Sequence, residues 1–212
     1  MSDLEFFFDP VCPWAWITSR WVVEVQQQRH YTVGWRFISL KMINEARDPD
    51  AYTEGHRASH MAGLYTHRVC DEVRLQHGNE AVGNLYTALG TAFHLQQRRP
   101  EINDRPTAFM AEMLANAGLP DQLAQHVFDE SHDAYVRDDT EAAFARTGRD
   151  VGTPIITFHP GAANEASFFG PVISTIPRGA EALRLWDAIE TIATTTGVAE
   201  LKRSLRAAPQ FD

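Results

Sequence analysis

The sequence predicts an α/β protein whose four-stranded sheet is interrupted by a long helical insertion. Three observations support this fold class. Two short strand patterns flank an amphipathic helix near the N-terminus, no strand pattern appears between about residues 50 and 150, and two further strands and a helix follow. The predicted order is therefore βαβ, a block of helices, and ββα. A strand–helix–strand unit of this kind is almost always parallel and right-handed.

The N-terminal unit begins with a strand over residues 4–8, which is aromatic and apolar and is expected to be buried. Asp9-Pro10 ends this strand. Pro13 suits the first turn of a helix, where its missing N–H does no harm. Apolar side chains then recur at helical spacing at Trp14, Ile17, Trp21, Val22 and Val25. Alternating apolar residues over 33–37 predict the second strand.

The middle of the chain is predicted to be helical throughout. Between about Asp50 and Asp150 the sequence is dominated by Ala, Leu, Met, Gln, Glu and Arg, and glycines and prolines divide it into several helices. We expect residues 1–48 and 149–212 to form one domain around the sheet, with residues 49–148 as the helical insertion.

The C-terminal unit returns to strands. Residues 154–158 are apolar and β-branched, residues 159–165 form a turn-rich link, and residues 166–169 complete a hairpin. A last helix follows Pro177, with one apolar face made by Leu183, Trp186, Ile189, Ile192 and Ala193. A short tail over 207–212 closes the chain.

Composition limits the partners. The chain has 212 residues, 44% of them apolar, and a net charge of −9. Nucleic acids and anionic membranes favour basic faces, so neither is expected as a main partner. No signal-peptide pattern and no apolar run of about 18 residues is present, so we expect a cytoplasmic protein.

The two cysteines are expected to differ. Cys12 stands where a strand gives way to a helix, and N–H groups at a helix N-terminus favour a thiolate. Its pKa is therefore expected to lie below the free value of about 8.5. Cys70 lies in the helical block beside Asp71 and Glu72, which disfavour a thiolate, so we expect it to be buried and inert. A disulfide between the two is not needed in a cytosolic chain of this length.

Several segments resemble one family. The sequence FFDPVCPWAWITSRW, residues 7–21, resembles the active-site region of the actinobacterial mycothiol-dependent nitroreductases, which are DsbA-like thioredoxin-fold proteins. The resemblance continues at residues 39–40, 44–45, 47–48, 85–88, 90, 94, 150–154, 168–172, 176–179, 185–187 and 209–212.

The resemblance implies a thioredoxin-like fold and a redox function. Proteins of this family are cytoplasmic, often homodimeric, and use mycothiol as reductant for disulfides or mixed disulfides. Some also reduce nitro-aromatic compounds without a flavin. We therefore expect mycothiol as thiol cosubstrate, a small-molecule or protein disulfide as substrate, and neither a metal nor a flavin. The expected catalytic motif is Cys12-Pro13-Trp14-Ala15.

Four further residues are expected to bind the substrate. In thioredoxin-like proteins the proline at the position of Pro154 is cis, and the residue before it, here Thr153, presents its backbone to the substrate. His94 falls in a matching block, and a histidine that titrates near pH 7 could hold a ligand or donate a proton. Asn44 could hydrogen-bond to the sugar part of mycothiol. Trp14 could stack on an aromatic substrate or pack in the core.

The motif departs from the family at its last position, where Cys-Pro-Trp-Cys becomes Cys-Pro-Trp-Ala. The second cysteine normally attacks the mixed disulfide and releases the product. Ala15 cannot do so. The chain is then either a natural single-thiol form, in which a second mycothiol resolves the adduct, or a variant engineered to trap an intermediate.

Two alternative functions remain open. Related transferases and isomerases of the kappa type activate a bound thiol without exchanging disulfides, so the chain could be a mycothiol S-transferase or isomerase. A non-catalytic thiol-binding module is the other alternative. A metal site on His56, His60 and His67, which share a helix face, is disfavoured because no partner carboxylate has an evident role.

Overall fold

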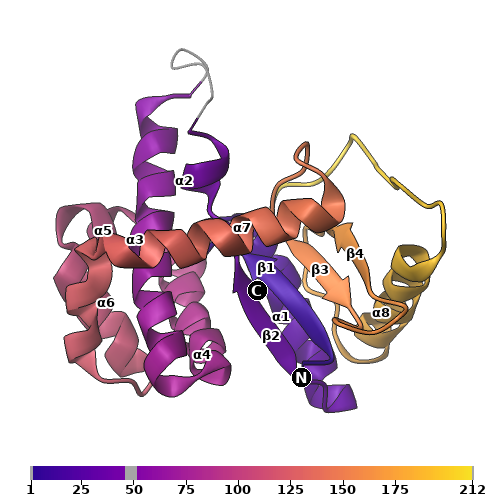
Figure 1. The fold of residues 1–212 in the computed structure, drawn as a ribbon, viewed down its shortest axis with the longest axis horizontal. Coiled ribbons are helices and arrows are strands. Elements are labelled where there is room, and N and C mark those ends of the chain that lie inside the picture. The colour runs from indigo at the N-terminus through magenta and orange to yellow at the C-terminus, as the bar shows by residue number, and fades with distance from the viewer. Residues whose placement is uncertain (1, 46–51, 212) are drawn as a thin grey trace.

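A computed structural model describes residues 2–45 and 52–211 of the chain (Figure 1). One four-stranded sheet has the order β2-β1-β3-β4, built from β1 (Leu4–Phe8), β2 (Val33–Phe37), β3 (Ile155–Phe158) and β4 (Ala166–Phe169). β1 pairs parallel with β2 and antiparallel with β3, and β4 is antiparallel to β3. The expected βαβ and ββα units are therefore confirmed. Pro154 alone is wrongly predicted as strand, because β3 begins one residue later.

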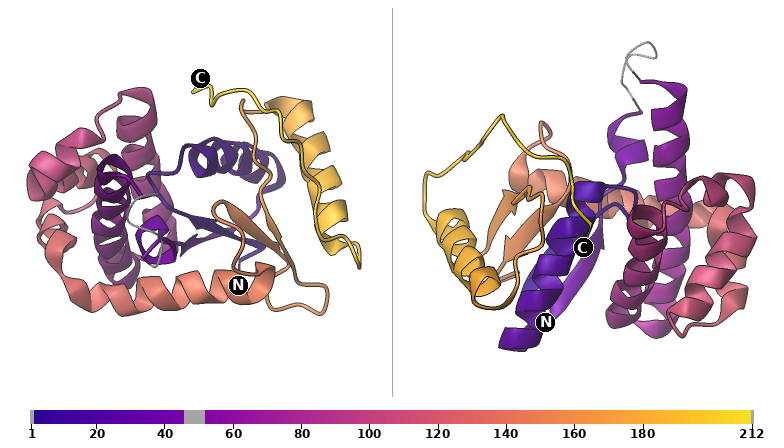
Figure 2. Two further views of the ribbon diagram at one scale, coloured as in Figure 1. Left: turned by 90° about the horizontal axis from the view of Figure 1, so that it is seen from above. Right: turned by 180° about the vertical axis from the view of Figure 1, so that it is seen from behind.

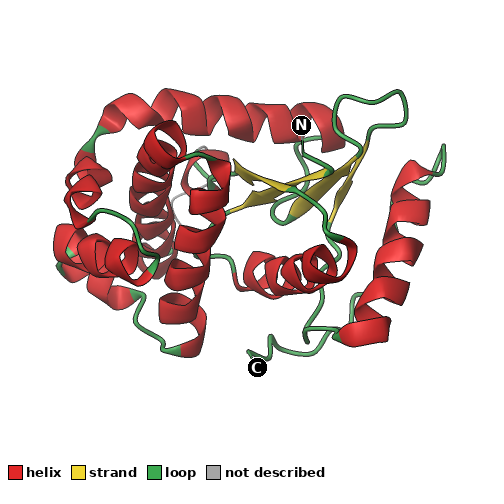
Figure 3. Cartoon of the chain, turned by 90° about the horizontal axis from the view of Figure 1, so that it is seen from below, coloured by secondary structure: helices red, strands yellow, loops and turns green. Residues whose placement is uncertain are grey.

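Helices cover both faces of this sheet. α1 (Pro13–Arg29) and α8 (Gly179–Thr194) lie on one face, and α7 (Asp133–Thr147) lies on the other (Figures 2 and 3). Phe6 and Phe8 face α1, whereas Phe7 packs with Ala143 and Phe144 beneath α7. Both faces of β1 are therefore largely buried, which explains why every residue of this strand except Glu5 is apolar.

The segment between the two halves of the sheet is helical, as predicted. After β2 the chain forms the short helix α2 (Leu40–Ile43), and a block of helices beside the sheet follows (Figure 1). The block comprises α3 (Glu54–His77), α4 (Asn79–Gly90), the π-helical η1 (Thr91–Leu95), α5 (Pro100–Asp104), α6 (Pro106–Asn116) and the 3₁₀ segments η2 (Asp121–Phe128) and η3 (Glu130–His132). α7 then runs from this block back along the sheet (Figure 1). The domain boundaries at 48 and 149 stay a prediction.

The block packs closely on the N-terminal unit. A Cβ atom at Gly90 would lie 2.0 Å from the Trp16 ring, and one at Gly83 would lie 2.3 Å from the Trp35 ring. Tyr86 stacks on Phe8 with ring centroids 3.9 Å apart. Glycine at these two helical positions lets α4 approach α1 and the sheet.

The C-terminal tail returns to the N-terminal end of α1. After α8 the chain continues without regular structure, and the Gln210 N–H donates to the Ser174 carbonyl at 2.8 Å. Arg206 lies over the Trp14 ring, 5.6 Å from its centroid, and Phe211 stacks on His94. None of the helices in residues 2–45 and 52–211 has the length and apolar character to cross a bilayer.

Candidate active site

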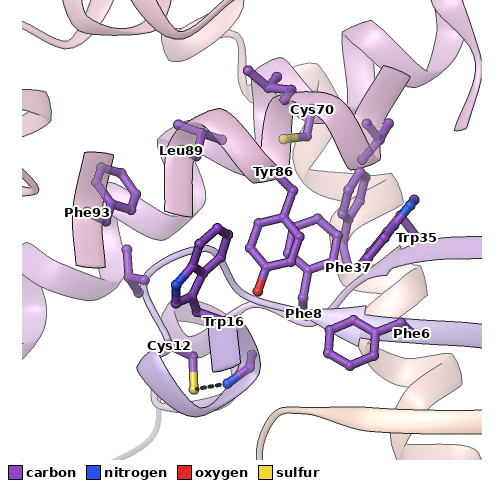
Figure 4. Close-up of a cluster of buried hydrophobic side chains, with 14 of the residues drawn as sticks. Phe6, Phe8, Cys12, Trp16, Trp35, Phe37, Cys70, Tyr86, Leu89 and Phe93 are labelled. Atoms are coloured by element: carbon purple, nitrogen blue, oxygen red, sulfur yellow. Dashed lines mark hydrogen bonds between the residues drawn. The ribbon is translucent and has the colours of Figure 1, made fainter. Parts of the chain in front are cut away.

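Cys12 is the N-cap residue of α1. The turn that precedes it is closed by the Cys12 N–H, which donates to the Asp9 carbonyl at 3.0 Å. Pro13 occupies the first helical position, and the Cys12 carbonyl accepts the Trp16 N–H at 3.0 Å. The Ala15 N–H points at the Cys12 sulfur, 3.5 Å away (Figure 4). The local sequence therefore places the thiol at the helix terminus, as expected.

Thr153 lies on the other side of the thiol. The peptide bond between Thr153 and Pro154 is cis, and the Cys12 thiol donates to the Thr153 carbonyl at 3.6 Å. The Thr153 hydroxyl donates to the Phe7 carbonyl at 3.1 Å, which fixes this segment against β1. Within the described residues no hydrogen bond of the Thr153 N–H is found.

The protonation state of Cys12 differs from the expectation. The residue is only 6% exposed, and burial raises the pKa of its thiol to about 12. The N–H groups of Ala15 and Trp14 lower this pKa, whereas the Asp9 carboxylate raises it. The predicted low pKa is therefore wrong for the chain without ligand, because desolvation outweighs the helix N-terminus.

A buried carboxylate that the sequence analysis missed supports the thiol loop. Asp9 is fully buried and accepts the N–H groups of Val11 at 3.1 Å and Leu40 at 2.8 Å. Gly63 of α3 lies so close that a Cβ there would be 2.5 Å from the carboxylate. Asp9 thus joins the loop before Cys12 to the start of α2 and to the helical block. From the sequence, Asp9-Pro10 was interpreted only as the end of a strand, so the hydrogen bonds of the Asp9 carboxylate were not predicted.

His94 holds the same loop from the side of the block. Its Nε2 lies 2.9 Å from the Pro10 carbonyl, and its ring stacks between Trp16 and Phe211, with centroids 5.9 and 5.5 Å away. Burial lowers the pKa of His94 to about 4. The ring is therefore neutral at pH 7, Nε2 donates to Pro10, and the expected titration near neutral pH is wrong.

The other motif residues divide between surface and core. Pro13 and Trp14 are half-buried, and Trp14 carries Arg206 of the tail over its ring. Ala15 is fully buried, so its methyl group faces the core while its N–H faces the sulfur. Trp14 was predicted to lie on the apolar face of the helix, and it is only partly buried there, whereas Trp16 is buried in the core.

Asn44 lies apart from these groups. It caps the C-terminal end of α2, where its side-chain amide donates to the Leu40 carbonyl at 2.7 Å. It is 3% exposed, and its Oδ1 has no donor within the described residues. No hydrogen bond or ring contact in that part of the chain joins it to Cys12 or Thr153. The matching segment at Arg47 lies outside the described residues.

Arg20 is a second group that sequence reasoning missed. Its guanidinium lies 4.2 Å from the Trp16 centroid and donates to the Thr87 hydroxyl at 3.0 Å. Its Nη2 is buried without a partner in the described residues, and burial lowers the pKa of Arg20 to about 10. Thr87 also borders a cavity of about 540 Å³ that is lined by residues of α4, η1 and α6. No atom of Cys12 lines that cavity.

Cys70 does not serve the site. It is fully buried on α3, and burial raises its pKa well above the usual range. Figure 4 shows it on the far side of Trp16 and Tyr86 from Cys12. Both cysteines are free. The expectation that Cys70 is buried is confirmed.

Three comparisons with known proteins agree with this arrangement. The family model described as "Rv2466c-like: Mycothiol-dependent nitroreductase Rv2466c" matches residues 11–203. The uncharacterized protein Rv2286c of Mycobacterium tuberculosis (strain ATCC 25618 / H37Rv) is 28% identical over 96% of this chain and 82% of its own length.

Solved structures show the same fold at low identity. A putative protein disulfide isomerase from Nitrosomonas europaea has a TM-score of 0.57 and 19% identity, covering 87% of this chain and 95% of its own. The cytosolic disulfide reductase DsbM from Pseudomonas aeruginosa has a TM-score of 0.55 and 16% identity, covering 78% and 88%. DsbM with GSH aligns with a TM-score of 0.52 and 16% identity, covering 74% and 86%. The predicted DsbA-like thioredoxin fold is confirmed.

Proposed function

The chain belongs to the Rv2466c-like family of mycothiol-dependent nitroreductases and is thus a thiol-dependent oxidoreductase; on this premise we propose that it exchanges disulfides with mycothiol through Cys12 alone. The observation that carries the proposal is the position of the Cys12 sulfur, which faces the Ala15 N–H on one side and the Thr153 backbone on the other. Such a thiol can accept a disulfide partner from one direction and have its thiolate stabilised from the other.

The reaction needs two exchange steps. The Cys12 thiolate attacks the mycothiol sulfur of a mixed disulfide, a bond to mycothiol forms, and the substrate leaves as a thiolate that takes up a proton. A second mycothiol then attacks the adduct and leaves as oxidised mycothiol, which restores the Cys12 thiol. The sum is one mixed disulfide and one mycothiol converted to one free thiol and one mycothiol disulfide. Ala15 takes no part beyond its N–H, so no internal disulfide is needed.

Deprotonation of Cys12 must accompany substrate binding. The pKa of about 12 keeps the resting thiol protonated at neutral pH. A bound disulfide that approaches along Thr153 competes with the hydrogen bond from the thiol to the Thr153 carbonyl. The Ala15 and Trp14 N–H groups, which already lower the thiol pKa, are then in place for the thiolate.

The remaining predicted residues have supporting roles in this proposal. The Thr153 backbone, whose carbonyl accepts from the Cys12 thiol, orients the substrate beside the sulfur, with Pro154 following it at the start of the next segment. Half-buried Trp14 offers a stacking surface once Arg206 moves aside. His94 positions Pro10. Asn44 offers its Oδ1, which has no donor within the described residues, to a sugar hydroxyl. The reaction takes place in an actinobacterial cytoplasm, where mycothiol is the low-molecular-weight thiol, and a homodimer is part of the same proposal.

The same site can supply electrons to a nitro-aromatic compound. Two mycothiols give two electrons and two protons, which convert a nitro group to a nitroso group and water while one mycothiol disulfide forms. The proposal that the chain reduces nitro-aromatic compounds is supported by the family to which it belongs.

A steady-state assay with mycothiol and a small mixed disulfide of mycothiol tests the proposal. Wild type and Cys70→Ser should turn over, because Cys70 is buried away from the site, and Cys12→Ser should be inactive. Turnover that survives Cys12→Ser would reject exchange at Cys12 and favour a transferase that activates a bound thiol. If mycothiol binds but neither wild type nor any variant turns over, the chain is a non-catalytic thiol-binding module.

A further inference from the structure

A second cluster of chemically active side chains lies in the helical block, outside the site around Cys12. It joins α3 to the 3₁₀ segments η2 and η3. Glu72 of α3, His126 of η2 and His132 of η3 each bring one ligand atom to a common centre, with all such atoms within 4.8 Å of one another. Asp129, between η2 and η3, adds a further carboxylate beside both histidines.

The spacing of these atoms matches a metal coordination shell. His132 Nε2 lies 3.4 Å from His126 Nδ1, 3.5 Å from a Glu72 oxygen and 3.8 Å from an Asp129 oxygen. His126 Nδ1 lies 3.3 Å from that same Asp129 oxygen. Ligands about 2.0–2.1 Å from a tetrahedral ion stand roughly 3.3–3.4 Å from one another. Glu72 approaches His126 at its other nitrogen, Nε2, 3.8 Å away. Adjustment of the Glu72 and His126 side chains would therefore bring one nitrogen of His126 and the other three groups around one ion.

The His132 ring is oriented with Nδ1 on Asp71 and Nε2 toward the cluster. His132 Nδ1 lies 2.8 Å from an Asp71 oxygen, so this nitrogen carries the proton and donates it. The other Asp71 oxygen accepts from Arg74 at 2.8 Å, which neutralises the carboxylate. Nε2 then presents its lone pair to the cluster. A histidine oriented by a carboxylate in this way is the usual second shell of a metal site.

The charges of the cluster call for a cation. The Nε2 lone pair faces the Glu72 carboxylate, and within the described residues the two histidines are the only basic ion-pair partners of Glu72. His132 is 6% exposed, so the repulsion is poorly screened by solvent. Either a proton on Nε2 or a metal ion between these atoms would remove the repulsion between the lone pair and the carboxylates.

We propose that Glu72, His126, Asp129 and His132 bind one divalent transition-metal ion, with zinc the best fit. Two imidazole nitrogens and carboxylate oxygens form a donor set that suits zinc, and its tetrahedral preference suits the spacing. The site is independent of the proposed exchange reaction. It ties α3 to the segment that leads into α7, the helix that runs from the block along the sheet (Figure 1). The ion therefore cross-links α3 to η2 and η3 within the block.

Zinc binding by the full-length chain tests this proposal. The protein is stripped with a chelator, kept reduced, and titrated with ZnCl₂ by calorimetry, with metal content per chain and melting temperature measured afterwards. Wild type should take up one zinc ion per chain and melt at a higher temperature when loaded. His126→Ala and Glu72→Gln should each weaken zinc binding at least tenfold and remove the rise in melting temperature.

Two controls separate this site from other ligands. His77→Ala removes an exposed histidine near the end of the same helix and should leave zinc uptake unchanged. Cys12→Ser should also bind one zinc ion, which excludes the thiol as the ligand. Co²⁺ bound to wild type should give the visible bands of a tetrahedral ion. If wild type takes up no zinc, or if His126→Ala and Glu72→Gln bind as tightly as wild type, the proposal is overturned and the cluster holds no ion.

Discussion

The reactivity of Cys12 toward an alkylating agent should be low and should rise with pH. Iodoacetamide reacts with the thiolate, so its rate follows the thiolate fraction. With a thiol pKa of about 12, that fraction at pH 7.5 is about 3 in 100,000, against roughly 1 in 10 for a free thiol of pKa 8.5. The native chain should therefore react about 3,000-fold more slowly than a model peptide.

The assay follows the second-order rate between pH 6 and pH 10 in a Cys70→Ser background, with mass spectrometry to assign the modified residue. The same protein in denaturant should react at the rate of the peptide. A fast reaction of the native chain that levels off below pH 7 would refute the reasoning. It would mean that the helix N-terminus outweighs burial and that the thiolate is already present at rest.

Further outcomes follow from the same structure. Because burial raises the folded pKa of Cys12 to about 12, the unfolded chain loses its thiol proton first, and stability is lost as pH rises from about 8.5 toward 12. Urea unfolding should show wild type losing about 2 kcal/mol more than Cys12→Ala between pH 8 and pH 10. Gly63→Ala forces a methyl group against the Asp9 carboxylate and should cost about 1–3 kcal/mol. Gly55→Ala in the same helix, where the new methyl group would meet only the Thr53 hydroxyl at 4.0 Å, should be neutral or stabilising by about 0.5–1 kcal/mol, and equal effects of the two variants in chemical denaturation would contradict this. Phe211→Ala removes the ring stacked on His94 and should raise the alkylation rate of Cys12 several-fold, and an unchanged rate would show that the tail does not limit access.

Most of the fold could be predicted because its signals are local. The aromatic strand over residues 4–8, the proline at the start of α1 and the alternation over residues 33–37 each reflect a single element. The long helical block was predictable from the absence of strand patterns. The packing of its helices was not, since it depends on contacts such as Gly90 on Trp16, which no periodicity encodes.

The candidate site was only partly predictable. The helix-terminal position of Cys12 follows from Pro13 and the preceding strand, and the expected approach of Thr153 follows from the resemblance. The predicted pKa values of Cys12 and His94 were wrong because the local sequence indicates which backbone dipoles lie near a group but does not indicate how deeply the group is buried. Cys12 contacts Thr153 and His94 stacks on Phe211, and both of these partners are far away in the sequence.

Asp9 and the zinc cluster illustrate the same limit. The Asp9 carboxylate acts on N–H groups at Val11 and Leu40, and the second of these comes from another element. The sequence analysis weighed histidines at positions 56, 60 and 67 as a metal set, because they share a helix face. In the structure His67 is buried against the Phe8 carbonyl, and the histidines that share a cluster with a carboxylate suited to a metal ion are His126 and His132.

Intact mass after treatment with oxidised mycothiol tests the central claim most directly. Wild type should gain one mycothiol on Cys12, and reduced mycothiol should remove it, because Ala15 leaves resolution to a second thiol molecule. An Ala15→Cys variant should lose the adduct without added thiol. An adduct that reduced mycothiol cannot remove would mean that Ala15 strands the intermediate, and the absence of any adduct on wild type would contradict exchange at Cys12.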